Sequence, residues 1–276
     1  MLNFLTKIVA YLQELFHETF NINIRGLGFL YRQFDKDQYF KVKGAELFFN
    51  HKIADNYGRL INGRFNEPET HKFIDKAIAV AGSNVRFVEV GGNIGEFVLD
   101  YAINSKVDKI VVFEPQLEQS KSIEKTIEKN NFNQVRLIKK LVSSVVEELF
   151  FNVPENNTYT AGINYNATSG IKMISTTLDI ELEKSEQPHI FLIDVEGAEF
   201  QVMKGGQQFI TANRPLIIFE YHLTTQTSFH VSDIQAFLGQ EYKIYRLNRE
   251  GNLDNELENA WNLVAIHTQS VFKNLA

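Results

Sequence analysis

A glycine-rich turn at residues 91–95 is the feature best suited to bind a ligand. The apolar run Phe-Val-Glu-Val at 87–90 leads into Gly91-Gly92-Asn93-Ile94-Gly95, and a helical pattern follows. Glycine allows the backbone of such a turn to approach a ligand without side-chain obstruction. Open α/β sheets bind ligands at the carboxyl ends of their strands, where this turn is placed. The turn is therefore a candidate nucleoside-binding loop.

Glu114 is the second candidate ligand-binding residue. It ends the apolar run 110–113 and follows the glycine turn by about 20 residues. This is the spacing expected for an acid that accepts hydrogen bonds from ribose hydroxyls. Together, the turn and this carboxylate indicate a nucleoside site.

The residues of the turn favour a nucleoside without a pyrophosphate. The dinucleotide pattern G-x-G-x-x-G requires glycine where this chain has Asn93 and Glu96. An anionic Glu96 at the helix start would repel a pyrophosphate. The turn instead reads E-x-G-x-N-x-G, beginning at Glu89. A carboxylate-lined pocket is compatible with the cationic sulfonium of S-adenosyl-L-methionine.

Further acids follow two later apolar runs. Asp194, Glu196 and Glu199 lie in the segment Leu-Ile-Asp-Val-Glu-Gly-Ala-Glu, and Glu220 and His222 end the run that starts at residue 216. Glu199 also fits as a favourable charge in the first turn of a helix.

Methyl transfer to an alcohol is assisted by a base. We expect Asp194 or Glu196 to act as base or orienting group, with His222 as a further candidate. Oxygen ligands from Asp194, Glu196 and Glu220 could surround a divalent cation. Their spacing does not require one, and no metal is predicted.

Short apolar runs alternate with helical patterns along most of the chain, which predicts a parallel sheet covered by helices on both faces. A helix is expected over 66–82, and a final antiparallel pair over 242–247 and 261–267. The remaining predicted strands are 85–90, 109–113, 135–138, 190–195 and 216–221, and the remaining predicted helices are 95–104, 117–130, 199–211 and 231–238.

The first 65 residues form a separate predicted unit. Leu5, Ile8, Val9, Leu12 and Phe16 have helical spacing, which predicts an amphipathic helix that packs on the domain or on a second subunit. We therefore expect a helical extension or cap over 1–65 and a catalytic domain over 66–276. The acceptor pocket is expected to include 29–49 and 152–169.

Composition limits the compartment and the partners. The chain has 276 residues, 44% of them hydrophobic, a formal net charge of −6 and no cysteine. Disulfides, thiolate metal sites and a cysteine nucleophile are excluded, and the net charge argues against nucleic acid as a partner. No run reaches the roughly 20 apolar residues of a membrane span, and the N-terminus lacks a signal-peptide pattern. We expect a cytoplasmic protein that acts on a small-molecule or glycan acceptor.

Taken in order, these motifs resemble the FkbM family of S-adenosylmethionine-dependent methyltransferases over about residues 66–222. The resemblance implies a class I methyltransferase fold, in which a seven-stranded sheet has an antiparallel last strand. It also implies O-methylation of a sugar or natural-product hydroxyl, with Asp194 and Glu196 near the reacting methyl. The residues it assigns to the cofactor are Glu89, Gly91, Gly92, Asn93, Gly95, Glu114, Pro115 and Asp194.

Three positions depart from the usual pattern of that family. Glu89 replaces a frequent Asp, Gly92 replaces Ala, and Ala198 stands where His is more common. The loss of that His removes a polar group near the substrate. Two alternatives remain at this point, a nicotinamide-dependent oxidoreductase on a similar sheet and a non-catalytic nucleoside-binding scaffold.

Overall fold

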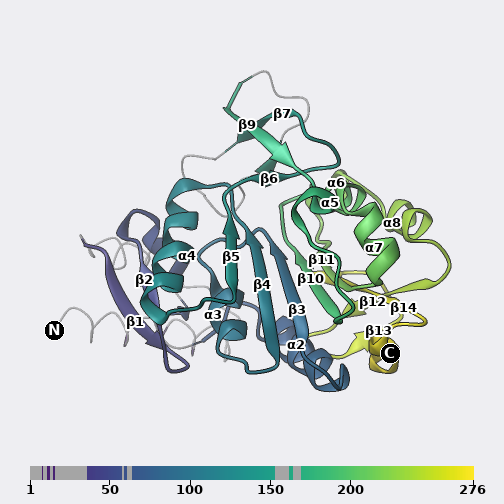
Figure 1. Ribbon diagram of the computed structural model, residues 1–276, viewed down its shortest axis with the longest axis horizontal. Coiled ribbons are helices and arrows are strands. Elements are labelled where there is room, and N and C mark those ends of the chain that lie inside the picture. The colour runs from purple at the N-terminus through teal and green to yellow at the C-terminus, as the bar shows by residue number, and fades with distance from the viewer. Residues whose placement is uncertain are drawn as a thin grey trace.

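A central sheet of eight strands organises the protein, seen here in a computed structural model (Figure 1). The structure describes residues 36–57, 59–60, 64–152, 162–163 and 169–276, and positions 8, 11, 12 and 15. The strand order is β13-β12-β14-β11-β10-β3-β4-β5. The bounds are β3 Val85–Val90, β4 Val107–Phe113, β5 Val135–Ile138, β10 His189–Ile193, β11 Leu216–Glu220, β12 Tyr242–Leu247, β13 Leu253–Asp254 and β14 Asn262–His267.

The strand directions are those of a class I methyltransferase-like sheet. β5, β4, β3, β10 and β11 run parallel to one another. β14 is antiparallel to β11 and lies between β11 and β12. The expected sheet with an antiparallel last strand is confirmed, and the two-residue β13 extends its edge. The predicted bounds of 85–90, 135–138 and 242–247 are those observed.

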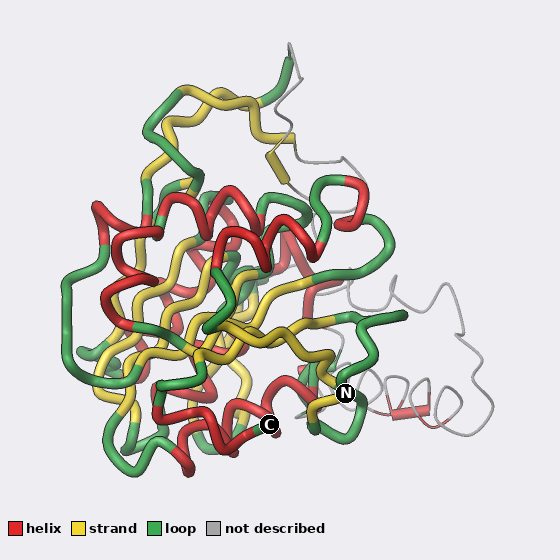
Figure 2. The backbone as a smooth tube through the Cα atoms, turned by 90° about the vertical axis from the view of Figure 1, so that its right-hand side faces the viewer, coloured by secondary structure: helices red, strands yellow, loops and turns green. Residues whose placement is uncertain are grey.

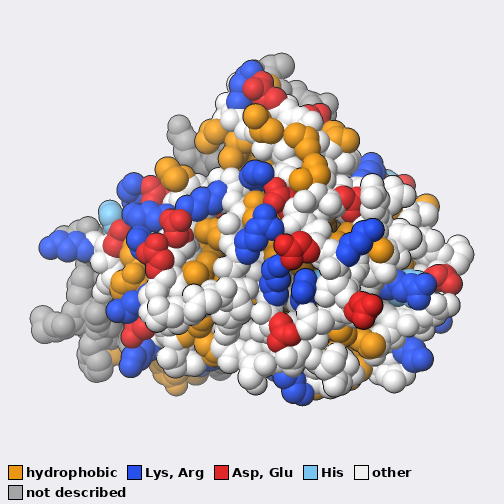
Figure 3. Space-filling view, viewed as in Figure 1, with side chains coloured by type: hydrophobic (Ala, Val, Ile, Leu, Met, Phe, Trp, Pro, Cys, Tyr) orange, Lys and Arg blue, Asp and Glu red, His pale blue; other side chains and the backbone are white. Residues whose placement is uncertain are grey.

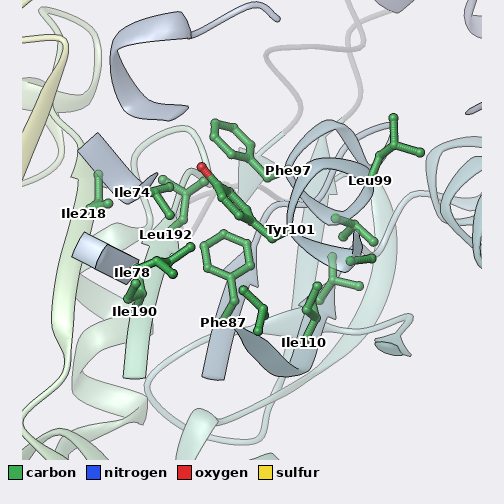
Figure 4. Close-up of a cluster of buried hydrophobic side chains, with 14 of the residues drawn as sticks. Ile74, Ile78, Phe87, Phe97, Leu99, Tyr101, Ile110, Ile190, Leu192 and Ile218 are labelled. Atoms are coloured by element: carbon green, nitrogen blue, oxygen red, sulfur yellow. The ribbon is translucent and has the colours of Figure 1, made fainter. Parts of the chain in front are cut away.

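Helices cover both faces of this sheet. Alternate residues of each strand point to opposite faces, so buried side chains form one cluster on each face. Ile78, Phe87 and Tyr101 belong to the cluster on one face, drawn in Figure 4. Met203 and Phe219 belong to the cluster on the other face. The first face is covered by α2 Pro68–Val80, α3 Glu96–Ala102 and α4 Leu117–Asn130, and the second by α5 Leu178–Glu181, α6 Glu199–Gly205, α7 Gln207–Asn213 and α8 Val231–Leu238.

The helix predicted over 199–211 is divided into α6 and α7. The break falls at Gly205 and Gly206, residues of low helix propensity. A Cβ on Gly205 would lie 2.1 Å from the carbonyl oxygen of Ser143. The two glycines therefore end α6 where its backbone packs against the segment that contains Ser143.

Residues 38–49 of the N-terminal region form a β-hairpin, so the predicted helical extension is wrong for these residues. β1 Gln38–Val42 pairs antiparallel with β2 Ala45–Phe49. Lys43 and Gly44 in the turn have φ values of 47° and 91°, as two-residue hairpin turns require. These strands are rich in aromatic residues, which favour a strand over a helix.

This hairpin packs on α4 and joins the main core. The backbone N–H of Phe48 donates to Thr126 Oγ1 at 3.0 Å, and that of Glu46 donates to Asn130 Oδ1 at 2.8 Å. Leu47 belongs to the same buried cluster as the residues of α2 and α3. After β2 a 3-10 helix, η2, spans His51–Tyr57. The domain division at residue 65 stays a prediction.

Most of the predicted amphipathic helix lies outside the described residues. Ile8 and Leu12 are described, have helical conformation and are 38% and 43% exposed. Leu5, Val9 and Phe16 lie outside. No helix among the described residues is long and apolar enough to cross a membrane.

A small second sheet projects from the body of the molecule (Figure 2). Its order is β6-β9-β7-β8, with bounds β6 Leu141–Val142, β7 Glu148–Asn152, β8 Gly162–Ile163 and β9 Ile171–Thr176. Hydrophobic side chains are visible on it in Figure 3, and Ile171 and Ile174 are 57% and 68% exposed. The chain thus extends beyond the central sheet between β5 and β10.

A buried polar network links α2 to α3. His71 Nδ1 lies 2.7 Å from Asp100 Oδ2, and its Nε2 lies 3.3 Å from Glu96 Oε1. The ring stacks between Phe65 and Phe97, at centroid distances of 4.0 and 4.2 Å. Burial alone lowers the pKa of His71, but the hydrogen bonds and charges of Asp100 and Glu96 outweigh it and raise the pKa. The imidazolium form is therefore stabilised in the folded protein.

We expect the stabilisation that His71 provides to decrease as the pH rises. Because folding raises its pKa, the stabilisation is complete below the unfolded-state pKa of about 6.5 and is lost as the pH passes the folded-state pKa. Urea unfolding of the wild type and H71Q, from about pH 5 to about pH 9, measures the difference in unfolding free energy. We expect about 3 kcal/mol at the acidic end, with a smaller difference at the basic end.

His189→Gln is the matched control, because its pH dependence should have the opposite sign. Burial and the charge of Arg86 lower the pKa of His189 to about 4. The wild type should therefore gain stability relative to H189Q as the pH rises from about 4 to about 6.5. Equal slopes for the two variants would contradict the His71 network.

Candidate functional site

Two adjoining cavities lie at the carboxyl ends of β3, β4, β10 and β11. The first has a volume of about 120 Å³ and is lined by Glu114, Lys140 and Ile163 among others. The second, of about 510 Å³, is lined by six acidic residues, and no Lys or Arg of the described residues lines it. Those six acids are Glu67, Glu89, Glu96, Asp194, Glu196 and Glu220. The residues shared by both cavities are Gly91, Asn93, Asp194 and Glu196.

The loops after β3 and β10 touch through their backbones. The N–H of Asp194 donates to the carbonyl of Val90 at 2.9 Å. A Cβ on Gly91, whose φ is +95°, would lie 1.8 Å from the carbonyl oxygen of Asp194. Glycine is therefore required here by the protein's own packing. The sequence had suggested instead that it leaves room for a ligand.

The N–H groups of the glycine turn are used inside the protein. Those of Gly91 and Gly92 both donate to the carbonyl of Phe113 at 3.0 Å, and that of Gly95 donates to the carbonyl of Gly92 at 2.7 Å. A Cβ on Gly92 would lie 2.3 Å from Val112 Cγ2. The turn therefore shapes the cavities with its backbone, while these three N–H groups are already committed.

Glu114 holds the same turn in place. Its Oε2 accepts the Asn93 N–H at 2.8 Å, and its Oε1 accepts the Gln116 N–H at 2.8 Å. Burial raises the pKa of Glu114 to about 7, although these backbone hydrogen bonds act in the opposite direction. Pro115 follows it and also lines the first cavity. The predicted ribose-binding acid thus also joins the ends of β3 and β4.

Glu89 and Glu67 contribute buried negative charge to the second cavity. Glu89 Oε2 is buried and has no hydrogen-bond partner in the described part of the chain. Burial and then the charges of Glu96 and Asp194 raise its pKa well above the ordinary value. Glu67 accepts hydrogen bonds from Thr70 Oγ1 at 2.9 Å and Asn262 Nδ2 at 2.7 Å. A cationic group in this cavity would be favourable.

The predicted catalytic residues converge at the wall of the second cavity. His222 Nε2 lies 3.0 Å from Glu220 Oε1 and 4.0 Å from Glu196 Oε2. One carboxylate oxygen of Asp194 and one of Glu220 lie within 4.8 Å of each other. Burial is the largest cause of the raised pKa of both carboxyl groups, and each of them is further raised by neighbouring acids. At least one proton is therefore shared by this pair near neutral pH.

The loop 194–199 is held by its own last residue. Glu199 Oε1 accepts the N–H groups of Val195 and Gly197, both at 3.1 Å. Within this loop Glu196 has a φ of 56°, an unusual value for a residue other than glycine. Its side chain is 22% exposed, and no described residue hydrogen-bonds to it. Glu196 is thus the acid of the loop most accessible from the cavities.

Several lining residues were not among the predicted site residues. Glu67 lies in the segment 66–82, where only a helix was expected. Trp261 lines the second cavity, is 56% exposed, and its ring lies 5.0 Å from that of His222. It is the only tryptophan of the chain, which is the one signal that could have drawn attention to it. Lys140 lines the first cavity, but its sequence surroundings contain no signal that indicates a site.

The two segments expected to form an acceptor pocket are placed differently. The described residues 36–49 line neither cavity. Ile163, from the segment 152–169, lines the first cavity next to Phe151. Residues 29–35, 153–161 and 164–168 lie outside the described residues.

A comparison with models of protein families identifies the family of this chain. The methyltransferase FkbM domain model matches residues 89–247, more than half of the chain. This chain belongs to the FkbM methyltransferase family. The cofactor of that family is S-adenosyl-L-methionine, so the nicotinamide-dependent alternative has no support.

Solved structures with similar folds are distant in sequence. The methyltransferase FkbM from Methylobacillus flagellatus KT is 14% identical with a TM-score of 0.46, covering 67% of this chain and 44% of that one. TYW2 from M. jannaschii, in complex with AdoMet, is 10% identical with a TM-score of 0.45, covering 84% of each chain. An rRNA methylase from Streptococcus thermophilus is 11% identical with a TM-score of 0.43, covering 74% and 98%. No curated protein matches this chain.

The residues of this FkbM-family chain fit the family's cofactor. S-adenosyl-L-methionine carries a positive sulfonium and no phosphate. Four of the five N–H groups of the turn 91–95 donate inside the protein, and the buried Glu89 Oε2 has no partner among the described residues. A cavity rich in acceptors, with no Lys or Arg among its described wall residues, suits a cation far better than a phosphate.

We expect Gly91→Ala to destabilise the FkbM-family fold far more than Gly44→Ala. Both glycines have φ near +90°, so both variants carry the backbone cost of a left-handed residue, about 1–2 kcal/mol. A Cβ at Gly44 has no atom within 4 Å, whereas one at Gly91 would overlap the Asp194 carbonyl. G91A should therefore cost at least about 2 kcal/mol more, measured by urea unfolding. Equal losses of unfolding free energy in G91A and G44A would show that the loops after β3 and β10 can move apart without cost.

Proposed function

We propose that this protein transfers a methyl group from S-adenosyl-L-methionine to a hydroxyl oxygen of a sugar, glycan or natural-product acceptor. The observation that carries the proposal is the junction of two cavities at Gly91 and Asp194 in an FkbM-family chain. Glu114, the acid expected to bind the ribose, lines the first cavity. The second is larger and lined by carboxylates, which can hold a cation and accept a proton.

Residues of both cavities would hold the cofactor. When bound, S-adenosyl-L-methionine supplies a methyl group on a positively charged sulfur. Glu114 would accept hydrogen bonds from the ribose while retaining its bonds to Asn93 and Gln116, since each carboxylate oxygen has more than one lone pair. Glu89 offers an unpartnered, buried oxygen to a positive group.

Glu196 is the residue best placed to accept the proton of the acceptor hydroxyl. It lines both cavities, and burial raises its pKa, which brings a carboxylate closer to the range useful for a base. Asp194 is engaged with Glu220. The Nδ1 of His222 accepts the Thr224 N–H at 3.0 Å, so the neutral ring carries its proton on Nε2 and acts as a donor.

The second cavity suits a hydroxylated acceptor. Trp261 presents an exposed aromatic surface beside the polar side chains of Asn66 and Thr224. An apolar surface with a few polar groups is typical of sites that orient a small ligand. A sugar ring has both an apolar face and hydroxyl groups that such a wall can bind.

Transfer of label tests this function. The purified chain is incubated with methyl-labelled S-adenosyl-L-methionine and a panel of glycosides, oligosaccharides and hydroxylated natural products. Label in an ether-linked methyl, located by mass spectrometry, is the expected result. Cofactor binding without transfer to any hydroxyl would favour the scaffold alternative, and label on nitrogen or carbon would exclude O-methylation.

We expect Glu114→Ala to weaken cofactor binding by at least about tenfold, because it removes charge-assisted hydrogen bonds worth about 1.5–3 kcal/mol each. Calorimetry with S-adenosylhomocysteine measures the dissociation constant. Glu118→Ala is the matched control, since Glu118 forms an ion pair with Lys52 outside both cavities. An unchanged affinity in E114A would remove Glu114 from the cofactor site.

We expect Glu196→Gln to lower turnover by about 10²-fold or more while changing cofactor affinity little, because it removes only the proton acceptor. Asp194→Asn should likewise lower turnover more than affinity, through its effect on the neighbouring acids. Initial rates of label transfer and calorimetry on the same samples separate the two effects. Full activity in E196Q would transfer the base role to another group.

A further inference from the structure

We propose that Asp194, Glu199 and Glu220 together bind one divalent cation. One carboxylate oxygen from each lies within 4.8 Å of the others. Asp194 follows β10, Glu199 begins α6 and Glu220 ends β11, so three separate elements bring these oxygens together. This site is additional to the cofactor and base roles proposed above.

Two of these carboxylates are buried with one oxygen left unpartnered. The exposed fractions of Glu199 and Glu220 are 0% and 4%. In each, Oε2 is buried and has no hydrogen-bond partner within the described chain. A buried polar atom of this kind destabilises the protein unless something binds it. A cation that binds both Oε2 atoms would remove this cost at both residues.

The other oxygen of each carboxylate is held in place. Glu199 Oε1 accepts the N–H groups of Val195 and Gly197, and Glu220 Oε1 lies 3.0 Å from His222 Nε2. These contacts fix the carboxylates by one oxygen and leave the other for a ligand. A cation site needs orienting contacts of this kind around its ligands.

The local charge also requires a cation or protons. None of the three carboxylates forms an ion pair with a described Lys or Arg, and the second cavity has neither residue in its wall. Oxygen-only ligands of this type select hard ions such as Mg²⁺, Mn²⁺ or Ca²⁺.

His222 is excluded as a ligand by its hydrogen bonding. Glu196, Glu220 and His222 also lie within 4.8 Å of one another. However, His222 Nδ1 accepts the Thr224 N–H, so Nε2 bears the proton and faces Glu220. A metal-bound histidine normally donates from its other nitrogen, and here that nitrogen is an acceptor. The carboxylate set is therefore favoured.

A cation at this position would act on the second cavity. Asp194 and Glu220 line that cavity directly, so an ion bound to them would lie at its wall. It would offset part of the negative charge of the six acids. It would also offer a coordination position to an acceptor oxygen and so help to orient it.

Mn²⁺ binding to the purified full-length chain, without cofactor or acceptor, tests the site. Electron paramagnetic resonance of free Mn²⁺ gives the stoichiometry and dissociation constant at mildly alkaline pH. We expect one ion per chain in the wild type and an affinity at least about tenfold lower in E199Q and E220Q. Glu183→Gln is the control, because Glu183 is exposed, pairs with Lys109 and should leave Mn²⁺ binding unchanged.

Absence of stoichiometric Mn²⁺ in the wild type, or wild-type affinity in both E199Q and E220Q, would overturn the proposal in favour of shared protons. Circular dichroism shows whether each variant is folded. If neither variant folds, thermal unfolding of the wild type decides, because an ion that binds the native state raises Tm. No rise with Mn²⁺ overturns the site. Since methyl transfer is not measured, failure here is distinct from failure of the proposed function.

Discussion

The contact between Gly91 and the carbonyl of Asp194 determines the geometry of the site. β3 and β10 are parallel neighbours, and the chain leaves both strands at the same edge of the sheet. The hydrogen bond from the Asp194 N–H to the Val90 carbonyl continues the pairing by one residue, and the missing Cβ of Gly91 lets the loops meet. The two cavities join at this contact, with Glu114 on one side and Glu220 on the other.

The second organising feature is negative charge buried without a basic side chain. Six acids line one cavity, and burial raises the pKa of Glu89, Asp194 and Glu220. Burying unpaired carboxylates is costly unless they are protonated or meet a cation. These carboxylates lie at the wall of a cavity, where a cationic ligand and a metal ion can both reduce the cost of their burial. The charge and the shape of the cavity thus both favour a cationic ligand.

Much of the fold was predictable because it depends on local patterns. The strands 85–90 and 135–138 and the helix 117–130 begin and end at the predicted residues, since apolar runs and helical spacing follow directly from which face is buried. The break between α6 and α7 and the hairpin at 38–49 were missed. Each depends on packing against a distant partner: Ser143 in one case, and α4 in the other.

By itself, the sequence determined which residues end the strands, and therefore that Glu114, Asp194 and Glu220 lie at one sheet edge, because parallel strands share their direction. Only the tertiary structure decided what these groups do there. It committed the N–H groups of Gly91, Gly92 and Asn93 to Phe113 and Glu114. It also fixed the proton of His222 on Nε2 and brought Glu199 to Glu220. Hydrogen-bond partners and convergent charges depend on distances between elements far apart in the chain, and residue spacing does not contain those distances.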